Sequence, residues 1–279
     1  MLRTSLWILA AIALTGTQAA AQLFPGEEDI DVNAAAAYAA ITTTPLGALP
    51  ASVNAGMIGL RRTGVTVRAQ FGHMDEEGPV SYRVFALGAD VPFGRGNVGL
   101  KVGRLDVGCD ESEFDDSGID LDCKGVTIAG VDWGQALLNN SLSADGTTSL
   151  VLGLDATLGY GTGDFLSARF DDASSLEASI TSVSASVGLP LALAAKSGRA
   201  TVVPHLTPRF AYGRQTAKVN ATGDSFFQDE EGTESGTRFM LGGGVDMFFS
   251  SVGVNIGFQK AFIKDGKTLI GVGLSYGLR

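Results

Sequence analysis

The chain has 279 residues, only 18% of them charged, and an acidic balance with a formal net charge of −10. Such a charge repels phosphate backbones, which excludes nucleic acid as an expected partner. A hydrophobic content of 45% excludes a disordered chain, and the frequent Gly, Ser, Thr and Asp residues interrupt the chain too often for a helical membrane protein.

The first 21 residues have the layout of a secretory signal peptide. Arg3 gives a positive start, Leu6 to Leu14 form an apolar core of nine residues, and Ala19 to Ala21 offer a small-residue cleavage site. Nine apolar residues are too few to cross ~30 Å of hydrocarbon as a helix, which favours a cleaved signal over a retained anchor. We therefore expect export, and no Cys follows the cleavage site to indicate a lipoprotein.

Residues 22–60 are predicted to be a lead-in that contains coil and one short helix. The Ala-rich run 35–41 can follow an Asp31 or Asn33 cap, and Pro45 would end it. The lead-in would lie either in the periplasm or in the lumen of the barrel described next.

From about Gly64 the hydrophobic pattern has a period of two, which is typical of β-strands. In the first strand Val65, Val67 and Phe71 alternate with Arg68 and Gln70. The same pattern predicts ten strands, near 64–73, 79–90, 97–106, 124–135, 148–162, 176–191, 200–217, 236–249, 252–261 and 268–278.

The connections between these strands alternate in length, which is typical of a transmembrane β-barrel. Those after the odd strands are mostly long or acidic: 73–78, 106–123, 163–175, 219–237 and 261–267. Those after the even strands are mostly short, with 137–147 as the exception. An even count places both ends on the short-turn side, in the periplasm. Counts of eight or twelve are also compatible, because Val126 and Ile128 compete with Val131 and Trp133 for the outward face, as at a bulge.

A soluble β-sandwich or lipocalin-like barrel shows the same alternation with its polar face outward. Three features favour the membrane. The polar faces are rich in Gly, Ser and Thr but poor in Lys and Glu, and the chain ends on a strand. The expected outer faces also end in aromatic residues, as interface girdles do: Phe71, Tyr82, Tyr160, Tyr212, Phe249, Phe258 and Tyr276.

Residues 61–279 resemble the small outer-membrane β-barrel proteins, the group of opacity-like and OmpA-like barrels. The resemblance rests on the signal peptide, the alternating loops, the Gly-rich strand Phe239 to Asp246 and the C-terminal strand. It implies a C-terminal signal for the barrel-assembly machinery, matched here by Gly273, Tyr276 and Leu278, although the chain ends at Arg279 where the group usually has Phe. It implies an assembly route and no activity.

Two loop features are candidate sites. Cys109 and Cys123, an even pair in an exported chain, predict a disulfide that closes a loop of about fifteen residues and stabilises by ~3 kcal/mol. The enclosed carboxylates suit Ca²⁺ but lack EF-hand spacing, so a solvated loop is favoured: Asp110, Glu111, Glu113, Asp115 and Asp116. A second acidic loop, 229–234, receives the same interpretation. Cations bound at these loops could bridge lipopolysaccharide phosphates, and no other metal and no cofactor is expected.

The faces interpreted as inward carry charges of both signs, which can pair and fill a narrow interior. The expected lumenal residues are Arg68, Arg83, Lys101, Asp132, Asp155, Glu177, His205, Arg209, Arg238 and Asp246. His73, near Asp75, is the one candidate general base, but spacing assigns it no serine or second carboxylate.

Three functions follow, in order of preference. The first is a non-enzymatic outer-membrane barrel of a Gram-negative cell, embedded in lipid and lipopolysaccharide, with acidic loops that bind an extracellular ligand or cation. The second is a narrow porin-like channel for small solutes. The third is a membrane-embedded hydrolase that uses His73.

Overall fold

The computed structural model describes residues 64–75, 80–94, 96–109, 119–170, 174–223, 230–262 and 268–278. These residues form β-strands and turns, and none of them belongs to a helix able to cross a bilayer. The expected signal peptide, the lead-in and its short helix lie outside the described residues. The strand segments are β1 (Thr66–Asp75), β2 (Val80–Phe93), β3 (Gly96–Cys109), β4 (Ile119–Cys123), β5 (Gly125–Ser141), β6 (Thr148–Phe170), β7 (Ser175–Gly188), β8 (Leu191–Ser197), β9 (Ala200–Thr222), β10 (Glu230–Phe249), β11 (Val252–Ala261) and β12 (Thr268–Gly277).

Two pairs of these segments are each one barrel strand with an interruption. β4 and β5 pair with β6 in a single register and are separated only by Lys124, whose N–H still donates to the Phe165 carbonyl. β7 and β8 likewise share their registers with β6 and β9 across Leu189 and Pro190. Proline has no N–H to donate, so it interrupts the ladder without shifting it.

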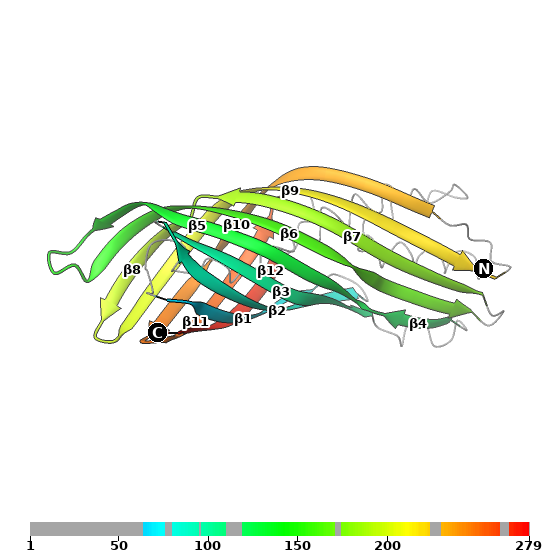
Figure 1. Cartoon of the computed structure of the whole chain (residues 1–279), viewed down its shortest axis with the longest axis horizontal. Helices are drawn as coiled ribbons and strands as arrows, with labels where there is room; N and C mark the ends of the chain where they lie inside the picture. Colours follow the sequence, from blue (N-terminus) through cyan, green and yellow to red (C-terminus); the bar gives the residue numbers. More distant parts are fainter. Residues whose placement is uncertain are drawn as a thin grey trace.

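The resulting ten strands form a closed antiparallel barrel. Each strand pairs with its neighbours in sequence, and β12 closes the ring by pairing with β1 from Thr66↔Gly277 to His73↔Ile270. Figure 1 shows the strands inclined to the long axis of the molecule, as closure requires. The predicted all-β barrel of ten strands is confirmed.

The two ends of the barrel differ in their connections. At one end, called the short-turn end, two-residue hairpins join β2 to β3, β8 to β9 and β10 to β11. The expected long connection 137–147 is mostly strand, and a six-residue turn from Leu142 to Thr147 remains, closed by a bond from the Leu142 N–H to the Thr148 carbonyl. Among the described residues, each of these four turns contains one with positive φ, namely Gly94, Gly146, Gly198 and Ser250.

At the opposite end one side of the barrel is taller than the other. The expected loops 163–175 and 219–237 are largely strand, because β6, β7, β9 and β10 continue beyond their neighbours (Figure 1). We call these extensions the tall wall: residues 119–123, 162–170, 175–181, 214–222 and 230–237. β10 pairs with β9 up to Glu230, but with β11 only from Met240.

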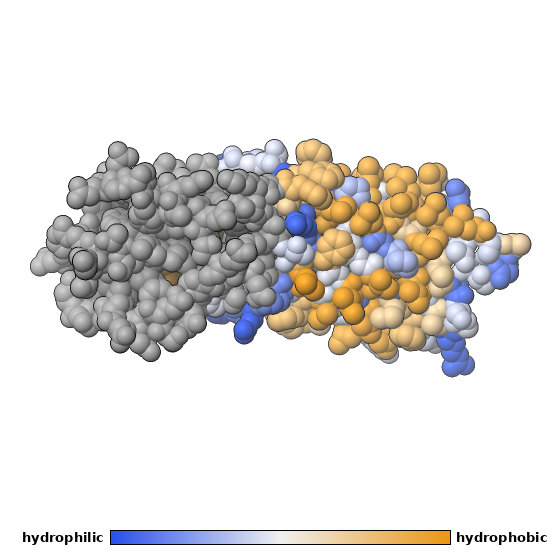
Figure 2. All heavy atoms as spheres, turned by 180° about the vertical axis from the view of Figure 1, so that it is seen from behind, coloured by the Kyte–Doolittle hydropathy of each residue, from blue (hydrophilic) through white to orange (hydrophobic). Residues whose placement is uncertain are grey.

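The outer surface of the barrel carries an apolar belt. On β9 it runs from Val202 to Tyr212 and on β10 from Phe249 to Phe239. Eleven residues of a strand tilted by about 40° span roughly 25 Å, the height of a lipid-facing band. Figure 2 shows this band on the face in view, with hydrophilic residues toward the ends. The expected aromatic residues lie in this exposed surface, with the exception of Tyr82.

Polarity reverses above the belt. On β6, Asp155 faces inward and Leu158 outward, whereas higher up Ala168 faces inward and Thr162 outward. On β7, Val183 faces outward within the belt, but in the tall wall Leu176 and Ala178 are the buried residues. The outer surface therefore changes from lipid-compatible to water-compatible along single strands.

This reversal corrects three inward or outward assignments. Arg83 and Glu177 are exposed on the outer face, and Tyr82 is buried inside. The prediction applied one polarity to the whole strand, but these residues lie beyond the belt, where the outer face meets water. On β5, Val131 faces outward and Ile128 inward without a bulge between them, and the register shift lies lower, between Ala136 and Leu138.

Candidate functional site

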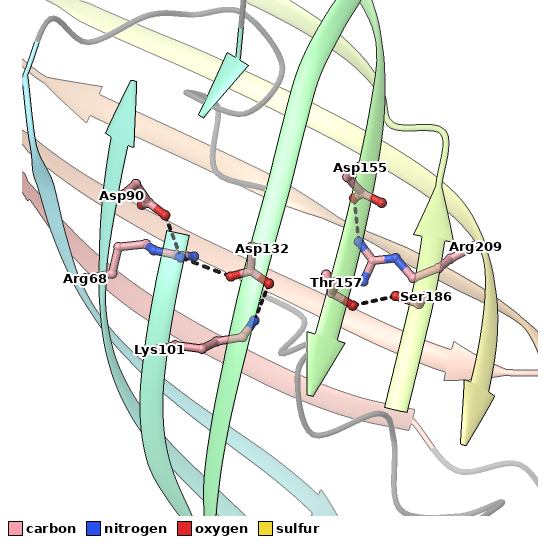
Figure 3. Close-up of polar contacts among 8 residues, drawn as sticks. All are labelled: Arg68, Asp90, Lys101, Asp132, Asp155, Thr157, Ser186 and Arg209. Carbon is pink, nitrogen blue, oxygen red and sulfur yellow. Dashed lines mark hydrogen bonds and ion pairs between the residues drawn. The ribbon is translucent and has the colours of Figure 1, made fainter. Parts of the chain in front are cut away.

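The lumen contains a group of four charged residues from four adjacent strands. Arg68 of β1 donates from Nη2 to Asp90 of β2 at 2.7 Å and to Asp132 of β5 at 3.2 Å. Lys101 of β3 donates to the other oxygen of Asp132 at 2.7 Å. Figure 3 shows the two cations meeting at Asp132. All four side chains are at most 3% exposed, so the group is removed from bulk water.

Glycines make room for this group. A Cβ on Gly99 would collide with the Asp90 carboxylate and with Nη2 of Arg68, and a Cβ on Gly88 would meet the Leu100 carbonyl at 2.9 Å and Nη2 of Arg68 at 3.6 Å. Gly99 is therefore required by the close approach of Asp90 and Arg68, and Gly88 by the Leu100 carbonyl on the neighbouring strand.

A second group lies beside the first in the lumen (Figure 3). Arg209 of β9 pairs with Asp155 of β6 at 2.5 Å, and the hydroxyls of Thr157 and Ser186 are 2.6 Å apart. Gly188 stands between these strands, where a Cβ would collide with the Asp155 carboxylate. We call the two groups together the ion-pair layer: Arg68, Asp90, Lys101, Asp132, Asp155 and Arg209.

The remaining buried charges lie on β9 and β10. His205 Nε2 is 3.7 Å from Asp246, and Arg238 is buried further along β10. Within the described part of the chain, the fully buried charged residues other than His205 comprise four acids and four bases. Three of the bases, Arg68, Lys101 and Arg209, form ion pairs with three of the acids, which offsets the cost of their burial.

Several buried polar atoms in this region have no hydrogen-bond partner in the described structure. They are Nε and Nη1 of Arg68, Nε of Arg209, Oδ1 of Asp155, Oδ2 of Asp246, Nδ1 of His205 and Oγ1 of Thr207. Buried polar atoms are almost always paired with protein or with ordered water. These atoms therefore mark positions in the lumen where a further donor or acceptor is needed.

Apolar residues lie inside the barrel on both sides of the ion-pair layer. Toward the short-turn end Val151, Ala192, Ala194 and Val203 form a buried cluster. Toward the opposite end, Val84 lies above Asp90 on β2. The same side of the ion-pair layer contains further apolar residues that point into the lumen, including Leu105, Val126, Ile128, Met240 and Leu269. Buried polar side chains share these levels, so the apolar layers are incomplete: Thr66 and Asn97 lie toward the short-turn end, and Gln70, Gln215 and Gln259 lie toward the opposite end.

The structure places most of the expected lumenal residues on the inner face. Eight of them are buried there: Arg68, Lys101, Asp132, Asp155, His205, Arg209, Arg238 and Asp246. Sequence reasoning missed Asp90, because it has the same parity as Tyr82, which the sequence analysis had placed on the outer face of the barrel. It also missed Thr157 and Ser186, which carry no charge to attract notice.

The other candidate residues lie apart from this layer. Gly273 faces inward on β12, while Tyr276 and Leu278 are exposed in the belt. His73 alternates with the inward residues of β1 and lies on the outer side with Phe71. The loop carboxylates Asp110, Glu111, Glu113, Asp115 and Asp116 lie outside the described residues.

Cys109 ends β3 and Cys123 ends β4, at the long-loop end of the barrel. The described residues include no free cysteine. Within the same ranges, no group of three or more His, Cys, Asp or Glu side chains is arranged to hold a metal ion.

Comparisons with known proteins extend to structure alone. No protein-family model and no curated protein sequence matches the chain. The translocator domain of the autotransporter NalP from Neisseria meningitidis is 13% identical, with a TM-score of 0.36, and the match covers 79% of this chain and 91% of that one. The N-terminal β-barrel domain of Pseudomonas aeruginosa OprF is 11% identical, with a TM-score of 0.30 and coverage of 78% and 98%. The attachment invasion locus protein Ail of Yersinia pestis is 13% identical, with a TM-score of 0.26 and coverage of 76% and 97%. The closed antiparallel ring of ten strands, with an exposed apolar belt around it, makes this chain a β-barrel whose outer surface suits a lipid bilayer.

Proposed function

We propose that this protein is a non-enzymatic barrel with a closed lumen, which anchors a surface-exposed wall and acidic loops in the outer membrane. The observation that carries this proposal is the ion-pair layer, in which Arg68, Lys101 and Arg209 are neutralised by buried carboxylates. An ion that entered the lumen would have to separate these buried pairs. Leaving a buried charge without its partner is costly, which opposes conduction.

Planar-bilayer recording tests the closed lumen. The purified, folded protein is expected to give no conductance above the baseline of the bilayer. As a positive control, Asp132→Ala with Lys101→Ala removes one neutral pair and empties part of the layer, and it is expected to admit small ions. Steady conductance by the wild-type protein would exclude a closed lumen.

A narrow channel is the second candidate, and the unpartnered atoms favour it. The Thr207 hydroxyl and one oxygen of Asp246 are buried polar atoms that water molecules could satisfy. A hydrated path past these atoms would conduct weakly, with a selectivity that changes on Asp246→Asn. The recording described above distinguishes the two candidates.

The surface role is supported by the outer face of the tall wall. Its strands carry cross-strand hydroxyl pairs, with Thr216 and Thr233 at 2.9 Å and Ser175 and Thr222 at 2.6 Å, and an exposed ion pair between Lys218 and Glu231. Such a face suits water and polar ligands. We propose that the short turns face the periplasm and that this wall, with the acidic loops, faces the exterior. Calorimetry with Ca²⁺ tests the loops, and loss of binding after Asp115→Asn with Asp116→Asn is expected.

Three further features complete the proposal. Residues 1–21 are a cleaved signal, so the mature chain should begin at Gln22 on N-terminal sequencing. Cys109 and Cys123 form a disulfide, so thiol alkylation should require prior reduction. The protein is not an enzyme, so lipid and peptide hydrolysis by the wild type should equal that of His73→Ala, and a specific loss in the variant would refute this part.

A further inference from the structure

The inner face of the tall wall is mostly apolar, with Gln215 as a buried polar exception, and the described strands do not explain its burial. Leu166, Leu176, Ala178 and Ala217 point inward and are between 1% and 5% exposed. The strands across the lumen end below this level, since the β10–β11 ladder begins at Met240↔Ala261 while the β10–β9 ladder continues to Glu230. A sheet face with no described strand opposite it would leave much of its surface in water, so an occupant other than the described strands is needed to cover these residues.

A stripe without side chains crosses the opposite wall of the lumen. Gly244 of β10 pairs with Gly257 of β11, which pairs with Gly271 of β12, which pairs with Gly72 of β1. All four lie on the inner face and are buried or half-buried. Four adjacent strands therefore carry no inward side chain at this level, which favours a close approach of backbone. His205 and Leu269 lie 3.2 Å and 3.3 Å from where a Cβ of Gly244 and of Gly72 would stand.

Buried polar atoms lie within the same lumen. Asp246 and His205 have side chains at most 3% exposed, and Oδ2 of Asp246 and Nδ1 of His205 have no hydrogen-bond partner among the described residues. The Thr207 hydroxyl and Nε of Arg209 are also buried without a hydrogen-bond partner. Backbone N–H and carbonyl groups that passed along the glycine stripe would supply both donors and acceptors.

The chain supplies a segment that fits these three features. Between Asn33 and Leu60 there is no Asp, Glu, Lys or Arg, and Ala, Gly and Thr are frequent. The segment reaches the barrel at the short-turn end, where the Leu278 N–H donates to the Val65 carbonyl. At roughly 3.3 Å per residue it can extend to roughly 90 Å, farther than the longest strand. It can therefore pass from the short-turn end to the tall wall.

We propose that residues 33–60 enter the lumen from the short-turn end, lie along the glycine stripe and cover the apolar inner face of the tall wall. The inference rests on the closed lumen proposed above and names the segment that completes its closure. Small uncharged side chains let the segment share the lumen with the ion-pair layer. The alternative occupants are an apolar small molecule and a second protein, and the experiment below separates them from the segment.

Thiol crosslinking in the full-length protein tests this placement. In a Cys109→Ser, Cys123→Ser background, Ala48→Cys is combined with Thr207→Cys, which points into the lumen. The matched control combines Ala48→Cys with Leu206→Cys, the adjacent residue on β9, which points into the belt. Treatment with a short bis-maleimide should link most chains of the first variant and none of the second, detected as altered mobility after denaturation.

Folded mobility before boiling confirms that both variants form the barrel. Folded Thr207→Cys chains that give no linkage with Ala48→Cys, or with Thr44→Cys and Ser52→Cys as further positions, would overturn the inference and leave the periplasm, a ligand or another protein as the alternatives. Linkage together with steady conductance would instead retain this inference and overturn the closed lumen. The two proposals therefore fail separately.

Discussion

The lower and upper halves of the same strands have opposite polarity. In the belt, β9 presents Leu206 and Phe210 outward and Thr207 and Arg209 inward. In the tall wall, the same strand presents Lys218 outward and Ala217 inward. Lipid surrounds the first half and water the second, so the outer face is apolar in the first half and polar in the second. The inner face has the opposite polarity in each half. A strand that crosses an interface therefore has no single inward pattern.

The largest expected effect is in the lower half, where charges are buried. Asp132→Asn leaves Lys101 without its carboxylate and Arg68 with one partner fewer. Removing one member of a buried ion pair costs about 3–5 kcal/mol of unfolding free energy. The measurement is urea unfolding of the folded barrel in detergent or lipid.

The exposed Arg104–Asp106 pair provides the control, with both side chains more than half exposed. Asp106→Asn should cost at most about 1 kcal/mol, because water and salt screen such pairs. Equal losses of unfolding free energy in Asp132→Asn and Asp106→Asn would show that the lumen is hydrated at the ion-pair layer.

A charge on the outer face tests the position of the belt. Leu158→Arg on β6 places a guanidinium in lipid and should cost about 2–4 kcal/mol, whereas Thr162→Arg, on the same face in the tall wall, should cost about 0–1 kcal/mol. Folding yield into lipid vesicles and urea unfolding measure both. If the two variants behave alike, the boundary between the halves is misplaced.

A smaller effect is expected from the hydroxyl pairs of the upper half. Thr216 and Thr233 face each other across β9 and β10 at 2.9 Å. Cross-strand pairs of this kind contribute about 0.2–1 kcal/mol. A double-mutant cycle with Thr216→Ala and Thr233→Ala should give a coupling in this range, and a coupling indistinguishable from zero would show that the pair contributes nothing to the wall.

The smallest effect concerns the turn Leu142–Thr147 at the short-turn end. Hydrogen bonds to Asp145 from the Ser143 side chain and from the backbone and hydroxyl of Thr147 lower the pKa of Asp145 to about 2. Because the folded pKa lies below the unfolded one, the stabilisation is present above about pH 4 and is lost as pH falls toward 2. NMR titration of the Asp145 carboxyl measures the midpoint. An unshifted midpoint, or one unchanged by Thr147→Val, would contradict this geometry.

The sequence predicted the barrel because alternation is local. Val65, Val67 and Phe71 already mark the lipid face of β1, and ten such runs with uneven connections define the ring. The ion pairs within the lumen were not predictable in the same way. Whether Arg68 lies beside Asp132 depends on the register of the three ladders between their strands. The inward assignment of Arg83 failed for a physical reason, since Tyr82 and Val84 form part of an inner apolar layer above the belt. The lengths of β9 and β10 were also underestimated, because their upper halves carry the Thr, Lys and Glu residues expected of loops.

Cysteine accessibility along β9 tests the central claim most directly. Single cysteines replace the outward residues Leu206, Phe210, Tyr212, Arg214, Thr216 and Lys218 in a Cys109→Ser, Cys123→Ser background, in native outer membranes. A water-soluble maleimide should label positions 214, 216 and 218 rapidly and leave 206 and 210 protected, with the transition at 212. Labelling of Phe210→Cys as fast as Thr216→Cys would contradict a lipid-embedded barrel with a water-exposed wall.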